Sequence, residues 1–172
     1  MARVWAAKPP APVAPPPLSP APQLSPLVRT TGPRSWRNRN PGNVRPVPPP
    51  DKWLGQVGVD NAPGGPFSIF RDDAHGFRAV CRVLMRYQAR GQTSVRAMLY
   101  TYAPPSENKT ESYIASVAEA LGVKPSEPVD IQDPRVMREL LRAIARVEGG
   151  AQCPAWDEAA ITEGMRLAGV EG

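Results

Sequence analysis

Apolar residues recur at helical spacing through most of the chain after residue 75. Positions three and four residues apart share one face of a helix, so this pattern predicts amphipathic helices. The predicted helices cover residues 76–90, 94–102, 109–121, 133–150 and 157–168. Before them, two short β-prone segments at 56–59 and 67–70 are separated by glycines and prolines, which predicts a small hairpin. We therefore expect an α+β fold that is mainly helical, with one small β-hairpin.

The segment 133–150, DPRVMRELLRAIARVEGG, has the clearest helical pattern in the chain. Asp133 can cap the first turn, and Pro134 suits the first helical position. The apolar stripe consists of Met137, Leu140, Leu141, Ile144 and Val147. Glu148 follows this stripe, and Gly149 and Gly150 are expected to supply the left-handed cap that ends the helix. The segment should lie on the hydrophobic core and carry a glutamate at its carboxyl end.

The position of Glu148 favours acid chemistry. The negative end of the helix dipole and an apolar neighbour such as Val147 both disfavour an ionised carboxylate, so the pKa of Glu148 should be raised. A glutamate of this kind can act as a general acid near neutral pH, and the two glycines would let a bulky substrate approach. The alternative is a solvated glutamate at a frayed helix end.

The first polar cluster is RNRNPGNVR at residues 37–45. It combines turn residues with asparagine amides and arginine guanidinium groups. Asn40, Asn43 and Arg45 carry groups that suit sugar hydroxyls, acetamido groups and carboxylates. The alternative is a loop whose asparagines satisfy the loop's own backbone.

The second polar cluster is YAPPSENKTESY at residues 102–113. Its tyrosines, Tyr102 and Tyr113, flank a proline turn, and aromatic rings beside hydrogen-bonding groups suit a sugar-binding site. A purely structural interpretation is also open. Tyr102 can continue a core stripe, and Asn108 with Glu111 has the spacing of a capping box.

Composition divides the chain into two parts. Residues 1–50 hold 15 of the 23 prolines and seven basic residues with no acidic ones, whereas the remainder has 14 basic and 16 acidic residues, so +7 and −2 give the net +5. We expect a disordered, Pro-rich basic tail over residues 1–33 and a folded domain over 34–172. The tail is either a spacer or a weak contact with a polyanion or other partner.

Several classes of function are not expected from this composition. The folded part shows no basic stripe interleaved with aromatic residues, which argues against specific nucleic-acid binding. No apolar run approaches the ~18 residues of a membrane span, and the amino terminus lacks a continuous apolar segment, so neither a span nor a signal peptide is expected.

Metal and nucleophile chemistry also lack the necessary residues. His75 is the only histidine, so a zinc site is not expected. Cys81 lies on an apolar stripe, Cys153 lies in a loop, and neither has the surroundings of a nucleophile. No G-x-S-x-G motif or glycine-rich phosphate loop occurs. Carboxylate chemistry without a cofactor or metal remains.

Four segments in order carry a resemblance to a known family. They are RNRNPGNVR, HGFRAVCRVL, TYAPPSENKTESYIASV, and AIARVEGG followed by ITEGMRLAGV. Together they resemble bacteriophage virion and lysis proteins related to the peptidoglycan-degrading lysin of enveloped double-stranded RNA phages, the cystoviruses. The resemblance covers roughly residues 34–170. It implies a lysozyme-like fold of the lytic transglycosylase type. The glutamate helix comes late in the chain, where it usually comes first, so we infer a circular permutation.

The resemblance implies cleavage of the glycosidic bond between N-acetylmuramic acid and N-acetylglucosamine, with Glu148 as the catalytic acid. A muramidase would need a second carboxylate, for which Asp51, Asp60, Asp72 and Glu107 are candidates without a compelling context, so a single-glutamate transglycosylase is favoured. The residues expected to bind the substrate are Asn40, Asn43, Arg45, Tyr102, Glu107, Asn108, Thr110 and Tyr113.

The expected partners are bacterial peptidoglycan and, through the tail, other virion proteins. The expected location is the virion, with action in the periplasm or cell wall. The alternatives are a murein endopeptidase and a non-catalytic virion protein that binds the wall.

Overall fold

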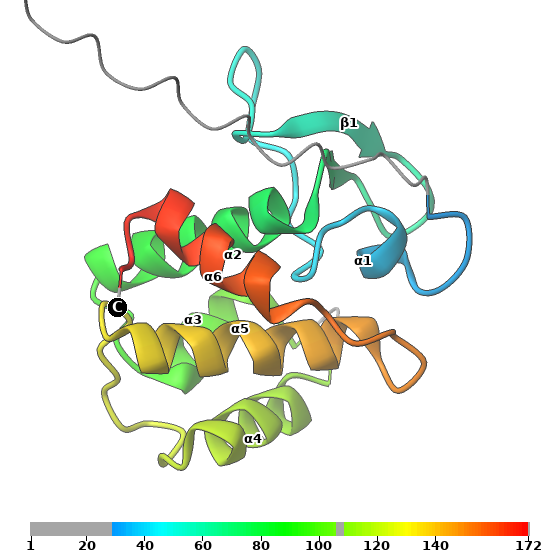
Figure 1. Cartoon of the computed structure of the whole chain (residues 1–172). Coiled ribbons are helices and arrows are strands. Elements are labelled where there is room, and N and C mark those ends of the chain that lie inside the picture. The colour runs from blue at the N-terminus through cyan, green and yellow to red at the C-terminus, as the bar shows by residue number, and fades with distance from the viewer. Residues whose placement is uncertain (1–28, 106–108, 172) are drawn as a thin grey trace, which may run out of the picture.

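The computed structural model describes residues 29–105 and 109–171, which form six helices and one two-stranded sheet (Figure 1). The helices are α1 (Arg34–Arg37), α2 (Asp73–Ala89), α3 (Val95–Tyr102), α4 (Thr110–Leu121), α5 (Pro134–Gly149) and α6 (Glu158–Ala168). The strands are β1 (Gln56–Asp60) and β2 (Phe67–Phe70), paired antiparallel. The mainly helical α+β fold with a small hairpin is confirmed. Helix α1 was not predicted.

Helix α5 is the central element of the helical part. It contacts α1, α2, α4 and α6, and Figure 1 shows it running between α4 and α6. The Asp133 side chain caps it by accepting a hydrogen bond from the Arg135 amide at 2.8 Å. Its stripe residues Met137, Leu140, Leu141 and Ile144 are each at most 1% exposed. The helix therefore holds its last turn in a fixed position relative to the core.

The predicted apolar stripe of α5 is wrong at one position. Val147 is 38% exposed, whereas Ala145 is 2% exposed and Gly149 is also buried. The buried face of the last two turns follows the i, i+4 row from Leu141 through Ala145 to Gly149, which turns Val147 toward solvent.

The hairpin connects the first polar cluster to the rest of the molecule. Gly58 pairs with Ile69 and Val59 with Ser68, with a bulge between Gln56 and Gly58. The β2 backbone also bonds to the cluster, because the Ser68 amide donates to Val44 O at 2.9 Å and the Phe70 amide to Asn38 O at 3.0 Å. The loop containing residues 38–45 is thereby held against the sheet.

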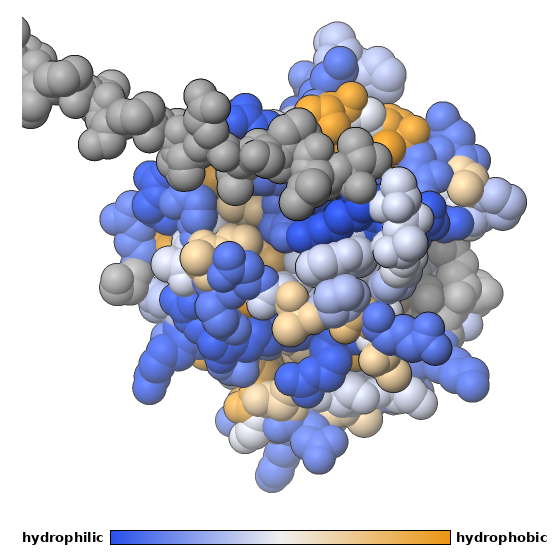
Figure 2. Space-filling model, turned by 45° about the vertical axis from the view of Figure 1, so that its right-hand side comes forward, coloured by the Kyte–Doolittle hydropathy of each residue, from blue (hydrophilic) through white to orange (hydrophobic). Residues whose placement is uncertain are grey.

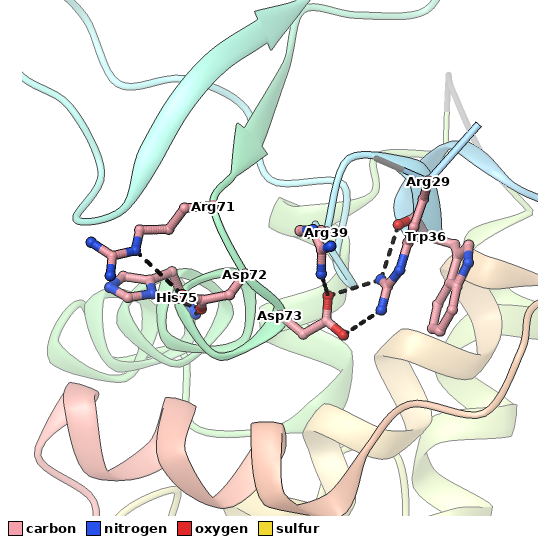
Figure 3. Close-up of polar contacts among 7 residues, drawn as sticks. All are labelled: Arg29, Trp36, Arg39, Arg71, Asp72, Asp73 and His75. Atoms are coloured by element: carbon pink, nitrogen blue, oxygen red, sulfur yellow. Dashed lines mark hydrogen bonds and ion pairs between the residues drawn. The ribbon is translucent and has the colours of Figure 1, made fainter. Parts of the chain in front are cut away.

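The folded part begins earlier than the predicted boundary after residue 33. Arg29 makes two hydrogen bonds to the Asp73 carboxylate, at 2.8 and 2.7 Å, and its guanidinium lies 3.4 Å from the centroid of the Trp36 ring (Figure 3). Asp73 is also 3.4 Å from Arg39. These contacts attach residues 29–33 to the start of α2. Residues 1–28, the rest of the predicted tail, lie outside the described residues.

Most of the surface in Figure 2 is hydrophilic, with a small apolar patch at the top of the molecule, where the hairpin lies in Figure 1. On the hairpin, Val57 is 65% exposed and Val59 is 38% exposed. Over residues 29–105 and 109–171, no helix has the length and apolar character needed to cross a bilayer.

Candidate active site

Glu148 lies in the last turn of α5 and faces the first polar cluster. The Asn43 side-chain amide donates a hydrogen bond to Glu148 Oε2 at 2.8 Å, across 105 residues of sequence. The glutamate is half-buried rather than frayed into solvent. The structure thus brings together the helix end and the asparagine-rich turn.

The pKa of Glu148 is raised, as predicted from the sequence. Burial is the largest cause, while the hydrogen bond from Asn43 and the nearby Tyr113 hydroxyl favour the ionised form and oppose the rise. The exposed Val147 does not supply this apolar environment. The outcome is a carboxyl group that retains its proton to higher pH than an ordinary glutamate.

The two glycines after Glu148 do not have the predicted roles. Gly149 is the last helical residue, and a Cβ on it would lie 2.7 Å from Cys153 Sγ, so this glycine allows close packing of a loop rather than of a substrate. Gly150 has φ 69° and ψ −178°, which is not the left-handed helical conformation of the predicted cap.

A groove of about 960 Å³ opens beside Glu148. Its walls come from the 42–48 segment, the turn between β1 and β2, helix α2 and the end of α3. Glu148 is the only carboxylate among the described residues that line it. The basic residues of the lining are Arg34, Arg45 and Arg86. The groove therefore combines one proton donor with an otherwise cationic rim.

Asn40 does not line this groove but holds together the turn that forms part of its wall. The side chain is fully buried, and its amide donates to Val44 O and Ser68 O, both at 2.9 Å, while its oxygen accepts from the Val44 amide at 2.7 Å. All of these partners are backbone groups. The expectation that Asn40 binds substrate is thus corrected to a structural role, because its polar atoms already hold the turn together.

The turn also explains how Asn43 reaches Glu148. Asn43 has φ 47°, a left-handed conformation that asparagine tolerates better than most residues. Next to it, Gly42 packs closely, since a Cβ there would lie 2.7 Å from Val80 Cγ2, and its carbonyl accepts a hydrogen bond from the Tyr102 hydroxyl. Tyr102 itself lines the groove, as expected for a binding residue.

Tyr113 lies behind the glutamate. It is 6% exposed and is not part of the groove lining. Burial first, and then the charge of Glu148, raise the pKa values of Tyr102 and Tyr113 well above their ordinary range. Both hydroxyls therefore remain protonated beside the carboxyl group. Because Tyr113 is buried next to Glu148 and does not line the groove, its position suits contact with Glu148 rather than with substrate.

The remaining predicted binding residues have different outcomes. Arg45 lines the groove and donates to Gly65 O at 3.1 Å. Thr110 is 2% exposed, and its hydroxyl donates to Ala103 O at 2.6 Å. This hydrogen bond anchors the start of α4, and the Thr110 hydroxyl does not face the groove. Glu107 and Asn108 lie outside the described residues.

Asn108, one half of the predicted capping box at the start of α4, lies outside the described residues. The N-cap residue is Lys109, whose side chain makes no capping hydrogen bond. Glu111 accepts hydrogen bonds from Arg96 at 2.8 Å and from the Tyr100 hydroxyl at 2.5 Å. Glu111 therefore forms an ion pair with another helix.

The candidate second carboxylates lie elsewhere. Asp60 accepts from Asn38 at 2.9 Å, and Asp72 caps α2 and contacts His75 Nδ1 at 2.7 Å. Figure 3 shows Asp72 and His75 together at the start of α2. Neither residue lines the groove beside Glu148. Asp51 lines a second groove, and Glu107 lies outside the described residues. None of the three described aspartates shares the groove with Glu148.

The cysteines do not have nucleophile geometry. Cys81 is fully buried, and burial raises its pKa to about 12. Burial also raises the pKa of the Cys153 thiol. Within the described part of the chain, no group of three or more histidine, cysteine, aspartate or glutamate side chains is arranged to hold a metal ion.

Several groove residues were missed by the sequence analysis. They are Arg34, Gly64, Gly65, Phe67 and Arg86. The guanidinium groups of Arg34 and Arg45 lie 5.1 and 5.3 Å from the Phe67 ring centroid, so they form one cationic wall. The hairpin was predicted, but its proximity to the asparagine turn depends on tertiary contacts.

Comparison with known proteins finds similarity to a phage protein. No protein-family model matches the chain. The chain is 29% identical over 127 residues to Protein P5 of Pseudoalteromonas phage PM2, a match that covers 73% of this chain and 76% of that protein. This similarity supports a relationship to a phage protein.

Proposed function

We propose that this protein is a phage lysin that cleaves the glycosidic bond between N-acetylmuramic acid and N-acetylglucosamine in peptidoglycan, with Glu148 as acid and then base. The observation that carries the proposal is the half-buried Glu148 carboxyl, held by Asn43 at 2.8 Å on the wall of a large groove. Its raised pKa suits a group that must carry a proton before the reaction begins.

The reaction proceeds in two proton transfers. Protonated Glu148 donates to the glycosidic oxygen, the bond from that oxygen to the anomeric carbon breaks, and an oxocarbenium-like sugar forms. The ionised Glu148 then takes a proton from the incoming hydroxyl as that oxygen bonds to the anomeric carbon. If the hydroxyl is the muramic 6-hydroxyl, an anhydro ring closes. If it is water, the product is the hydrolysed sugar.

The composition of the groove supports a mechanism with a single carboxylate. Glu148 has no acidic neighbour among the described lining residues, so no second carboxylate there is available as a nucleophile. The Asn43 amide stabilises the carboxylate that exists between the two transfers, because this hydrogen bond favours the ionised form. We therefore favour the lytic transglycosylase over the muramidase.

The cationic wall suits this substrate. Peptidoglycan strands carry carboxylates on their peptides, and Arg34 and Arg45 present guanidinium groups along the same groove as the acid. The phage relative supports a role as a phage protein. We propose that the protein acts on the cell wall as a virion component.

The test is digestion of purified peptidoglycan by the full chain and by Glu148→Gln. We expect Glu148→Gln to stay folded and to lose more than ~100-fold in the rate of wall solubilisation. The matched control is Glu119→Gln, which removes an exposed glutamate from α4 and should keep the parent rate.

Mass spectrometry of the released fragments identifies the bond that is cut. Anhydro-muropeptides support the transglycosylase, reducing muramic ends indicate a muramidase, and freed peptide crosslinks indicate an endopeptidase. Unchanged lysis by Glu148→Gln would overturn the assignment of the acid. Tight wall binding without release of soluble fragments by the parent chain would show a non-catalytic wall-binding protein.

A further inference from the structure

A second groove of about 670 Å³ lies beside the first and shares walls with it. Val47, Trp53 and Arg86 line both grooves. The two cavities are therefore neighbouring parts of one depression on the molecule, with Glu148 in the first part only.

Helix α2 provides a row of cations in the second groove. Arg78, Arg82 and Arg86 line it, and their i, i+4 spacing puts them on one face of the helix over about 12 Å. Lys52 adds a fourth cation from the opposite side. Asp51 is the only acidic residue among the described residues of this lining.

Arg78 Nε donates to Leu167 O at 3.2 Å, but the other two arginines of this row are not neutralised as other helical arginines are. Arg142 pairs with Glu158 at 2.8 Å, and Arg166 with Glu163 at 2.7 Å. Within the described residues, neither Arg82 nor Arg86 pairs with a carboxylate; Arg82 contacts Met85 Sδ at 3.7 Å, and Arg86 lies 5.8 Å from the Trp53 ring centroid.

The arrangement is unfavourable without a ligand. Like charges at i, i+4 repel each other, and α2 has no acidic residue beyond Asp73 at its first position. Burial and then the nearby charge of Arg82 lower the pKa of Arg78, which is consistent with crowded cations. An anionic ligand along this face would remove the repulsion.

The shape of the site selects among anionic ligands. Arginine forks bind carboxylates in a bidentate manner, and about 12 Å is the span of three to four residues of extended peptide. A single-stranded nucleic acid would need open aromatic faces for base stacking, whereas Trp53, the aromatic residue lining this groove, is 9% exposed.

We infer that the second groove binds the carboxylates of the short peptide attached to a muramic acid residue whose sugar lies in the first groove. This inference rests on the proposed glycosidic function and deepens it. It makes Lys52 and Arg82, which line the second groove but not the first, determinants of preference for peptide-bearing strands.

The test is a binding measurement that does not depend on turnover. The full chain carrying Glu148→Gln is titrated with a disaccharide-tetrapeptide muropeptide and, separately, with the same disaccharide lacking its peptide. We expect the peptide-bearing form to bind at least ten times more tightly, with a difference that shrinks as salt is added. Adding Lys52→Gln and Arg82→Gln should reduce the difference to about threefold or less, because only Arg78 and Arg86 of the row remain, and should leave binding of the bare disaccharide within twofold.

The matched control adds Arg90→Gln and Lys124→Gln, which remove two exposed positive charges outside both grooves. It should keep the tenfold preference. Equal affinity for the two ligands, or an equal loss in the control, would overturn the inference. So would a single-stranded oligonucleotide that binds more tightly than the muropeptide through Lys52 and Arg82. Because the assay needs no catalysis, a wrong assignment of Glu148 as the acid would appear in the digestion experiment and not here.

Discussion

Asn43 and Glu148 are joined by a 2.8 Å hydrogen bond between a left-handed turn and the end of a buried helix. The bond has two effects on the carboxyl group: it fixes its orientation, and it stabilises its ionised form. Burial acts in the opposite direction and has the larger effect. The proton affinity of Glu148 is therefore a balance that single substitutions can shift.

Replacing Asn43 by glycine should shift this balance upward. Glycine accepts φ 47° without strain, so the turn is kept while the hydrogen bond is lost. Without that bond the pKa of Glu148 rises further, and the alkaline limb of the rate-against-pH profile moves to higher pH. The rate at the optimum should fall about ten- to hundredfold, because the acid is less well oriented.

Tyr113→Phe should move the same limb in the same direction, since the Tyr113 hydroxyl also favours ionised Glu148. Asn61→Gly, in the exposed hairpin loop, serves as the control and should keep the parent profile. A limb that moves to lower pH in either site variant would contradict the role given to Asn43 and Tyr113.

The buried acid should also lower the stability of the fold at neutral pH. Because the pKa of Glu148 is raised in the folded state, folding favours its protonated form. The stabilisation from this group is complete below the unfolded pKa and is lost as the pH rises through the folded pKa. Glu148→Gln should therefore melt at a higher temperature than the parent at pH 7, and the gap should close toward pH 4. Calorimetry at both pH values checks this, and a variant less stable at pH 7 would contradict it.

The ion pair that attaches Arg29 to the start of α2 should respond unequally to loss of either partner. The two side chains are only 17% and 11% exposed, and Asp73 also faces Arg39 (Figure 3). Asp73→Asn leaves two arginines without their carboxylate and should cost about 3–5 kcal/mol of unfolding free energy. Arg29→Ala leaves Asp73 with Arg39 and should cost less. Urea unfolding of the two variants tests the order.

Gly164 should resist replacement by alanine, although alanine favours helices. In the contact between α2 and α6, a Cβ on Gly164 would lie 2.6 Å from Phe77 Cβ and 2.8 Å from Ala74 O. The helix preference of alanine is worth about 1 kcal/mol, and an overlap of this kind costs about 1–3 kcal/mol. We expect a net loss of stability in thermal melts. A gain would show that α6 can shift away from α2 at little cost.

The elements that could be predicted from sequence are those with a repeating pattern. The stripe of α5 was found because Met137, Leu140, Leu141 and Ile144 all face the core. Helix α1 was missed because its four residues, RSWR, contain no repeat. Its position depends on tertiary contacts, among them the Trp36 ring beside Arg29 and Trp156.

The candidate site could likewise be predicted from the sequence only in part. The raised pKa of Glu148 was expected from the sequence, and Glu148 and the asparagine turn were expected to act on the same substrate. The sequence did not indicate which asparagine faces the groove, because Asn40 and Asn43 have the same chemistry and differ only in what surrounds them. The i, i+4 arginines of α2 are visible in the sequence, but which acidic residues lie near them on the folded surface is not.

The long separation between Asn43 and Glu148 has a consequence for when a complete site exists. The groove walls from the 42–48 segment, the hairpin, α2 and α3 are all encoded before residue 105, whereas the proton donor arrives only with the final third of the chain. A product truncated before α5 would lack both the acid and the helix that packs against α1, α2, α4 and α6. A complete site would then require that the chain be made at least through residue 148.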